Sequence, residues 1–353
     1  MKRQIIISIG SLQSGGAERV VCEISAMYAD YFQEVVILTW IDLPQFYQID
    51  ARVRIVCAEK ESGFSSRFRQ FLWVRKFVKR EKPDVFLSFL MPFNMLNIVT
   101  LAFTKINVVV CERQDPSKVK TPFLRGVRNF LYHFVSRIEV QTKEGKRYFP
   151  SSLQHKIYVI PNPNHITREQ RDYCLSCPKD NRIVTVGRLI AAKNHLLLID
   201  AFTEVYAKYP YYRLDIYGSG DLRPALEEAI LFSGIKEHIH LCGKTNDVPK
   251  SIASAQLFVL SSNVEGMPNS LMEAMALGIP CVATDVSGVR DLITDKENGL
   301  IVPVGNKEAL IKAILKLIES RELQKQFSNS TYSVCEKYDK YKIFNMWLEI
   351  VTF

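Results

Sequence analysis

The stretch Glu265-Gly-Met-Pro-Asn-Ser-Leu-Met-Glu273 places two carboxylates eight positions apart, across a predicted turn from strand to helix. The apolar run 255–260 predicts a buried strand, and 270–277 predicts a helix with Pro268 well placed in its first turn. Backbone N–H groups at a helix start have no intrahelical acceptor, so such a start suits a phosphate. Two glutamates beside a phosphate would be repulsive unless they bind the hydroxyls of a sugar and a ribose. The segment therefore predicts a bound sugar diphosphate; the alternative is an ordinary turn with two surface glutamates.

Strands and helices alternate along the whole chain, which predicts an α/β fold with parallel sheets. One series of apolar strands and intervening helices runs over residues 5–160, and a second runs over 181–302. Pro161-Asn-Pro-Asn164 separates them, because prolines and asparagines end regular structure. We therefore expect two Rossmann-like domains facing across a cleft. The expected boundaries are 1–163 for the N-terminal domain, 164–180 for a linker, 181–335 for the C-terminal domain and 336–353 for a last helical segment.

Four further motifs accompany the two glutamates in a fixed order along the chain. They are Ser14-Gly-Gly-Ala-Glu18, Gly187-Arg188-Leu189 followed by Lys193, Tyr217-Gly-Ser-Gly-Asp-Leu222, and Asn298-Gly-Leu-Ile-Val-Pro303. Together with the E-x7-E segment they resemble the retaining glycosyltransferases of glycosyltransferase family 4. The resemblance covers nearly the whole chain and is densest between 181 and 303. It implies the GT-B fold, in which 1–163 would be the acceptor-binding domain and 181–335 the nucleotide-sugar-binding domain. The helix within 336–353 would cross back to the N-terminal domain.

The resemblance implies a role for each motif. Arg188 and Lys193 would hold the donor diphosphate and stabilise the charge that develops on it as the glycosidic bond breaks. Glu273 would bind the ribose hydroxyls, and Glu265 would lie at the transferred sugar. The expected catalytic residues are Glu265, Arg188 and Lys193. The expected donor-binding residues are Gly15, Gly16, Arg188, Lys193, Gly218, Lys244, Glu265, Gly266, Met267, Pro268, Asn269, Ser270, Leu271 and Glu273.

Several other kinds of site are disfavoured by the sequence. Gly10, Gly15 and Gly16 lack the spacing of the dinucleotide fingerprint, which argues against a dehydrogenase. The chain contains no Asp-x-Asp motif, and Cys174-Leu-Ser-Cys177 has no second pair to complete a zinc site. We therefore expect no metal and no cofactor, with a nucleotide sugar, UDP-linked by preference, as the donor substrate.

Positive charge is concentrated in the N-terminal half. Residues 1–163 contain 24 Lys and Arg against 14 Asp and Glu, whereas the remainder contains 22 against 23. A predicted helix near 66–80 carries a stripe made of Arg69, Trp73, Lys76 and Arg80. Such a basic helix suits an anionic membrane surface or a lipid pyrophosphate, so we expect its three cations to bind the acceptor. The alternative is a solvated basic helix whose aromatic residues belong to the core. Nucleic acid is not indicated by any motif.

The run Cys111-Glu-Arg-Gln-Asp115 departs from the family pattern. Many relatives carry a histidine near the reacting sugar in the loop after a central strand of the N-terminal domain, and here Arg113 takes that place. Arg113 is therefore a further expected acceptor-binding residue, where its guanidinium would meet a phosphate or a sugar hydroxyl. The alternative is an ion pair with Glu112 or Asp115.

These features predict a retaining enzyme that moves a hexose or N-acetylhexosamine to a lipid-linked oligosaccharide of surface polysaccharide assembly, such as O-antigen or capsule. No charge-free run of 18 apolar residues predicts a transmembrane helix, and residues 1–9 continue as a strand rather than a signal peptide. We therefore expect a cytoplasmic protein bound peripherally to the inner face of the plasma membrane, with a polyprenyl-diphosphate-linked glycan as acceptor. A UDP-sugar 2-epimerase of the same fold and a non-catalytic lipid- or polysaccharide-binding module are the alternatives.

Overall fold

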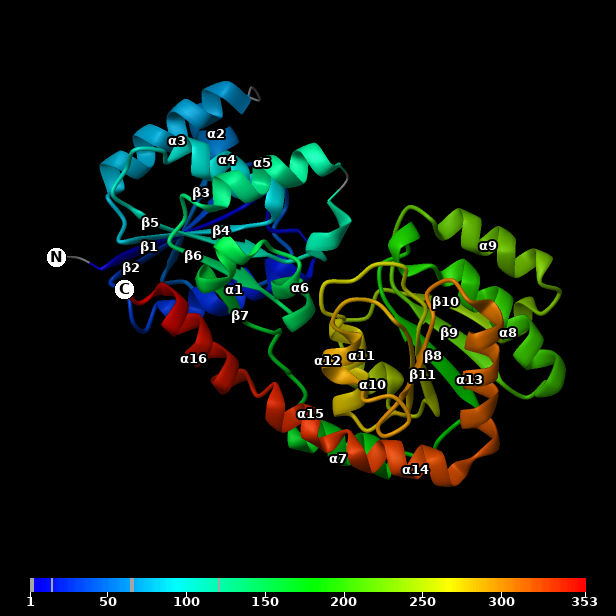
Figure 1. The fold of residues 1–353 in the computed structure, drawn as a ribbon. Helices are drawn as coiled ribbons and strands as arrows, with labels where there is room; N and C mark the ends of the chain where they lie inside the picture. The colour runs from blue at the N-terminus through cyan, green and yellow to red at the C-terminus, as the bar shows by residue number, and fades with distance from the viewer. Residues whose placement is uncertain (1–2, 14, 64–66, 120) are drawn as a thin grey trace. The chain divides into compact units, whose positions relative to one another are not determined.

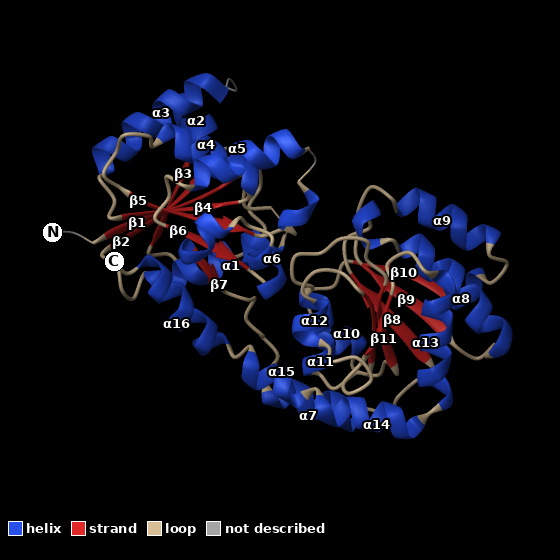
Figure 2. Cartoon of the chain, in the orientation of Figure 1, coloured by secondary structure: helices blue, strands red, loops and turns tan. Residues whose placement is uncertain are grey.

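The computed structural model describes residues 3–13, 15–63, 67–119 and 121–353, and the chain divides into two compact units. Unit 1 comprises Met1–Asn162 with Tyr341–Phe353, and unit 2 comprises Pro163–Lys340. Each unit contains one sheet of parallel strands with helices packed on it (Figures 1 and 2). The predicted α/β class with two Rossmann-like sheets is confirmed.

The sheet of unit 1 has seven strands in the order β3-β2-β1-β4-β5-β6-β7. The strands are β1 (Gln4–Ile9), β2 (Glu34–Thr39), β3 (Val53–Cys57), β4 (Val85–Phe89), β5 (Asn107–Glu112), β6 (Arg137–Val140) and β7 (Ile157–Val159). All residues of β1 are buried, as expected of a central strand that is covered on both faces. From β1 the chain adds β2 and β3 on one side of the sheet. It then returns to place β4 beside β1 and adds β5, β6 and β7 on the other side.

Helices cover both faces of this sheet. They are α1 (Gly16–Tyr28), α2 (Ala58–Ser62), α3 (Arg67–Glu81), α4 (Met91–Thr100), α5 (Pro122–Tyr132), α6 (Lys143–Arg147) and α16 (Lys340–Val351). Apolar residues of α1 and α16 share one core, and those of α3, α4 and α5 share the other. In α16, Trp347 is fully buried and stacks on Phe89 at 5.8 Å, and its carbonyl accepts a hydrogen bond from Tyr28 at 2.7 Å. The last helix of the chain is therefore part of the core of unit 1.

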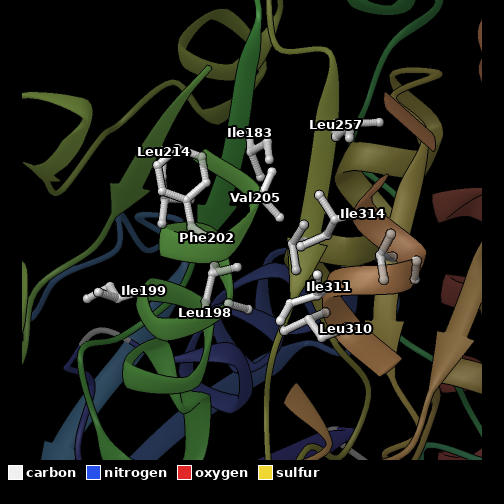
Figure 3. Packing of buried hydrophobic residues seen from close by; sticks show 14 of the residues in the cluster. Ile183, Leu198, Ile199, Phe202, Val205, Leu214, Leu257, Leu310, Ile311 and Ile314 are labelled. Carbon is white, nitrogen blue, oxygen red and sulfur yellow. The ribbon is translucent and has the colours of Figure 1, made fainter. Parts of the chain in front are cut away.

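The sheet of unit 2 has six strands in the order β10-β9-β8-β11-β12-β13. The strands are β8 (Arg182–Val186), β9 (Arg213–Tyr217), β10 (Ile239–Gly243), β11 (Leu257–Leu260), β12 (Cys281–Thr284) and β13 (Leu300–Val302). The helices are α7 (Arg168–Ser176), α8 (His195–Lys208), α9 (Arg223–Phe232), α10 (Val248–Ile252), α11 (Asn269–Ala276), α12 (Val289–Leu292), α13 (Lys307–Glu319), α14 (Arg321–Ser330) and α15 (Tyr332–Lys337). Figure 3 shows one of its cores, where Phe202 of α8 and Ile314 of α13 pack toward the strands.

The segment 164–180, expected from the sequence to be a linker, is an ordered part of unit 2. It contains α7, which Thr167 and Gln170 begin with a reciprocal capping box. The buried Arg171 donates to the carbonyl of Ala276 at 2.6 Å and to that of Ser328 at 2.9 Å. Because an arginine can satisfy several carbonyls at once, this one side chain ties α7 to the ends of two other helices.

Candidate active site

The sheet of unit 2 changes direction between β8 and β11. These parallel neighbours are in register at Ile183 and Leu257, and from them the chain builds outward to β10 on one side and to β13 on the other. In open α/β sheets, ligands bind beyond the carboxyl ends of the strands at such a switch point. Two loops meet the strand ends here, residues 187–194 after β8 and residues 261–268 after β11.

A lysine and a glutamate from these two loops form an ion pair. Lys193 Nζ lies 2.5 Å from Glu265 Oε1, and the hydroxyl of Ser262 donates to the same oxygen at 2.6 Å. Their side chains are 17% and 11% exposed, so the pair is sheltered but still reaches solvent. The aliphatic part of Lys193 lies against Gly187, where an added methyl group would come within 3.4 Å of it. The structure thus brings together two of the three predicted catalytic residues.

Main-chain and side-chain hydrogen bonds hold the two loops together. The N–H of Asn263 donates to the carbonyl of Ala192 at 2.8 Å, and Asn194 donates to the side-chain oxygen of Asn263 at 3.0 Å. The hydroxyl of Ser261 donates to the carbonyl of Lys193 at 3.0 Å. Since Asn194 adopts a left-handed conformation at φ 48°, the loop turns sharply just after the lysine. These contacts fix the position of the ion pair.

The third predicted catalytic residue, Arg188, follows β8 with its side chain exposed. Its carbonyl lies 3.3 Å from Nε2 of the buried His195. Burial lowers the pKa of His195 to about 4, so the ring is neutral at pH 7 and Nε2–H donates to the carbonyl. His195 was not predicted from the sequence, although it lies at the start of a recognisable helix, α8. Its role is to position the main chain of Arg188.

Two glycines of the Tyr217–Leu222 motif pack directly on the Arg188 loop. Gly218 has φ 150°, and a methyl group there would lie 1.8 Å from the carbonyl oxygen of Gly187. A methyl group at Gly220 would lie 2.4 Å from the carbonyl oxygen of Leu189. The N–H of Gly218 donates to the carbonyl of Gly243 at 2.8 Å, which places Lys244 at the end of the adjoining strand. Glycine is required here because one main chain must approach another.

The start of α11 follows the Glu265 loop. The first intrahelical bond runs from the N–H of Met272 to the carbonyl of Pro268, so the preceding N–H groups lie in the first turn. Met267 and Leu271 belong to the buried core, which leaves only their main-chain atoms for the predicted donor contacts. Glu273 is buried one turn into the helix, at 8% exposure. The other predicted donor residues of this segment are Gly266, Asn269 and Ser270, each half-buried.

Gly288 also belongs to this site, and the sequence analysis missed it. It has φ 80° at the start of α12, and a methyl group there would lie 2.7 Å from the carbonyl oxygen of Gly266. Nearby, Thr284 at the end of β12 donates to the carbonyl of Ser262 at 2.6 Å. The third strand end therefore buttresses the Glu265 loop. A glycine shortly after a predicted strand was the available signal.

The predicted glycine loop of unit 1 lies between β1 and α1. Gly15 is the N-cap of α1 in an extended conformation, its carbonyl accepts the first helical hydrogen bond from Arg19, and Gly16 is the first helical residue. Ser14 of the same motif lies outside the described residues. Gly15 and Gly16 thus follow the carboxyl end of the central strand of unit 1, at that sheet's own switch point.

Arg113, predicted to bind the acceptor, is instead a buried structural residue. Its side chain is 2% exposed, and Nη1 lies 2.7 Å from Oε1 of Glu139, which is fully buried. Nη2 donates to the side-chain oxygen of Asn162, and the guanidinium lies 5.8 Å from the ring centroid of Trp347. The alternative of an ion pair was correct in kind, but Glu139 on the neighbouring strand is the partner rather than Glu112 or Asp115.

The basic stripe on α3 is partly as predicted. Arg69, Lys76 and Arg80 are exposed, whereas Trp73 is half-buried and stacks on Phe77 at 5.0 Å. The tryptophan therefore packs toward the core of unit 1 and does not extend the cationic face. Residues 64–66 of the predicted basic segment lie outside the described residues.

Two features are absent from the described residues. No group of three or more His, Cys, Asp or Glu side chains there is placed to hold a metal ion. No described helix combines the length and hydropathy needed to span a bilayer.

Known proteins match both the sequence and the fold. Residues 168–334 match the model of the family described as glycosyl transferases group 1. A Campylobacter jejuni protein named GalNAc-alpha-(1->4)-GalNAc-alpha-(1->3)-diNAcBac-PP-undecaprenol alpha-1,4-N-acetyl-D-galactosaminyltransferase is 26% identical over 99% of this chain and 98% of its own length. The amylovoran biosynthesis glycosyltransferase AmsD of Erwinia amylovora is 24% identical over 99% of this chain and 100% of its own length.

Among solved structures, Anabaena HepE in complex with UDP and glucose superposes with a TM-score of 0.82. It is 17% identical, and the match covers 98% of each chain. The expected GT-B fold is thereby confirmed. The chain is therefore a glycosyltransferase with the GT-B fold, and its residues 168–334 match the model of glycosyl transferases group 1.

Proposed function

We propose that this enzyme is a retaining transferase of family 4 that moves a hexose or N-acetylhexosamine from a UDP-sugar to a polyprenyl-diphosphate-linked glycan. The observation that carries the proposal is the ion pair of Lys193 and Glu265, held between the ends of β8 and β11. A sheltered cation beside a helix start suits a diphosphate, and a carboxylate suits sugar hydroxyls. The undecaprenol-linked acceptor in the Campylobacter relative's name and the UDP bound to HepE support the two substrate classes.

The residues of unit 2 divide the work of the reaction. Arg188 and Lys193 stabilise the negative charge that grows on the departing diphosphate. Glu265 binds hydroxyls of the transferred sugar, and Glu273 binds those of the ribose. The departing phosphate oxygen takes the proton of the acceptor hydroxyl, which attacks from the same face, so the anomeric configuration is retained. No metal or cofactor takes part.

The acceptor side of the proposal rests on unit 1. Arg69, Lys76 and Arg80 lie on the exposed face of α3 and suit the diphosphate of a lipid carrier. Such an acceptor is anchored in the bilayer, so the enzyme works as a peripheral protein at the cytoplasmic face of the inner membrane. Its product would contribute to a surface polysaccharide. The name of the AmsD relative likewise assigns that protein to the biosynthesis of amylovoran.

The test is a transfer assay with a panel of UDP-, GDP- and ADP-sugars and a synthetic polyprenyl-diphosphate disaccharide. The expected result is transfer from one UDP-sugar, with an α-anomeric product identified by NMR coupling constants. A β-linked product would overturn the retaining mechanism. Conversion of a UDP-sugar into its 2-epimer without an acceptor would identify the epimerase alternative instead.

A further inference from the structure

Three helices of unit 1, α3, α4 and α5, form a layer over one face of its sheet (Figure 1). Their inward side chains, such as Val74, Ile98 and Tyr132, belong to a single buried core. Helix α4 contacts both α3 and α5, so the three helices are neighbours. The outward side of this layer presents an unusual surface.

Phenylalanine side chains are exposed on this outer side. Five of them are between 64% and 103% exposed. They are Phe68 on α3, Phe103 just after α4, and Phe123, Phe130 and Phe134 on or just after α5. Among the phenylalanines elsewhere in the described chain, Phe232 alone is exposed to this degree. Exposed aromatic residues concentrated in one region mark an interaction surface.

The arrangement of these rings is specific. Phe123, Phe130 and Phe134 recur at helical spacing along one side of α5, and the rings of Phe130 and Phe134 meet edge to face at 5.3 Å. Phe103 is fully exposed and has φ 62°, a left-handed conformation that is strained for a bulky residue. Glycine or asparagine would be less strained there, so the ring is retained at a cost to stability.

Exposed lysines accompany the rings on these elements. The stretch 67–137 as a whole is basic, with fourteen Lys and Arg against four Asp and Glu, although Arg113 and Arg128 within it are buried. Lys76 and Lys79 are exposed on α3, and Lys105 is exposed two residues after Phe103. Arg75 donates to the carbonyls of Thr100 and Ala102 at 2.5 and 3.1 Å, which ties the basic helix to the segment that ends in Phe103.

We propose that this layer docks on an anionic lipid bilayer, with Phe103, Phe130 and Phe134 inserted at the interface and the lysines at the headgroups. Apolar aromatic rings insert at the boundary between headgroups and acyl chains, and each nearby cation adds attraction to an anionic leaflet. The net positive charge of this layer favours a lipid surface over a protein partner. Residues 67–137 contain only four Asp and Glu, so few acidic side chains could pair with the cations of a protein. The inference rests on the proposed function in one respect: a lipid-linked acceptor would hold the enzyme's substrate at the bilayer.

The experiment measures cosedimentation with vesicles of phosphatidylcholine alone and with phosphatidylglycerol added, in the absence of any acceptor. The variant F103S/F130S/F134S should bind anionic vesicles about tenfold or more weakly. The matched control is Phe232→Ser, an equally exposed ring on α9 of unit 2, which should bind as the wild type does. K79Q/K105Q should weaken binding to anionic vesicles, and added salt should do the same to the wild type.

Transfer to a soluble, lipid-free acceptor reports whether the variants keep an intact site, and it should be unchanged in all of them. Phe103→Gly sharpens the test, because it should melt no lower than the wild type while binding vesicles more weakly. Equal vesicle binding by the triple phenylalanine variant and the wild type would overturn the docking surface, as would a wild type that ignores anionic vesicles. If vesicle binding behaves as expected but no sugar is transferred, the proposed function fails and the docking surface stands.

Discussion

Each unit of this enzyme contains an ion pair between residues at or near the ends of its parallel strands, and the two pairs differ in burial. In unit 1 the side chains of Arg113 and Glu139 are 2% and 0% exposed, and the guanidinium also contacts Asn162 and Trp347. In unit 2 those of Lys193 and Glu265 are 17% and 11% exposed, at a switch point beside a helix start. The first pair has no surface left for a ligand, whereas the second has.

The comparison shows that a charged residue after a central strand is not by itself a binding residue. What differs is the partner: Glu139 comes from the adjoining strand and closes over Arg113, whereas Glu265 comes from a loop and leaves Lys193 reachable. We therefore expect changes in unit 1's pair to alter stability and changes in unit 2's pair to alter catalysis.

The largest effect is expected from Arg113→Ala, which leaves the Glu139 carboxylate buried without its partner. At pH 8 the free energy of unfolding should fall by about 3–5 kcal/mol, measured by urea denaturation. The double variant Arg113→Met with Glu139→Leu removes both charges and should recover much of the loss. A fully stable Arg113→Ala protein with impaired transfer would reverse the comparison and restore a ligand-binding role.

Next in size are Lys193→Ala and Arg188→Ala. In the proposed mechanism each removes a cation that stabilises the departing diphosphate, so turnover should fall by about 10²–10³ while the protein stays folded. Lys208→Ala is the matched control, because Lys208 forms an exposed ion pair with Glu319 in the same unit and should keep full turnover. Loss of stability without loss of turnover in the Lys193 variant would show that the two pairs are alike.

Glu273→Ala tests the ribose contact. Loss of a hydrogen bond to a carboxylate should weaken UDP binding by about 1.5–3 kcal/mol, measured by isothermal titration. Glu273 is buried within α11, so circular dichroism should first establish that the variant retains its helices. Unchanged UDP affinity in a folded variant would remove Glu273 from the donor site.

The pH dependence of stability sharpens the account of the buried pair. Burial raises the pKa of Glu139 to about 7 from its ordinary value of 4.5, despite the opposing effect of Arg113. Between these values the folded protein holds a proton that the unfolded chain releases, so this group's stabilising contribution is lost as pH rises from 4.5 to 7. The slope is at most about 1.4 kcal/mol per pH unit. Relative to the wild type, Glu139→Gln should show a flatter profile across this window and the same profile elsewhere.

The smallest effect is expected from metal removal. If the two cations of unit 2 suffice for the diphosphate, EDTA should leave the transfer rate unchanged within error. Complete loss of activity with EDTA, restored by Mn²⁺, would show that Arg188 and Lys193 do not stabilise the diphosphate without a metal ion.

The positions of the strands along the chain and the place of the Glu265 loop could be predicted from the sequence, because both depend on local residue patterns. The described strands fall, to within one residue, inside the two predicted series, 5–160 and 181–302, β11 lies within the predicted run 255–260, and α11 begins directly after Pro268. The Arg113 partner was not predictable, since it lies 26 residues away and is chosen by the pairing of β5 with β6. Gly288 and His195 were missed for the same reason: their importance comes from contacts with other loops. The segment 164–180 was misjudged because its polarity concealed one buried arginine.

The return of α16 to unit 1 has a consequence for biosynthesis. Trp347 belongs to the core of unit 1, whose strands are synthesised before unit 2, yet it is itself synthesised only after unit 2. Until then Phe89 of β4 and Tyr28 of α1 lack the side chain and the carbonyl that they contact in α16, while unit 2 can already fold on its own residues. Unit 1 is thus begun before unit 2 and completed after it, and a nascent chain that stalls before α16 would expose these apolar side chains to chaperones.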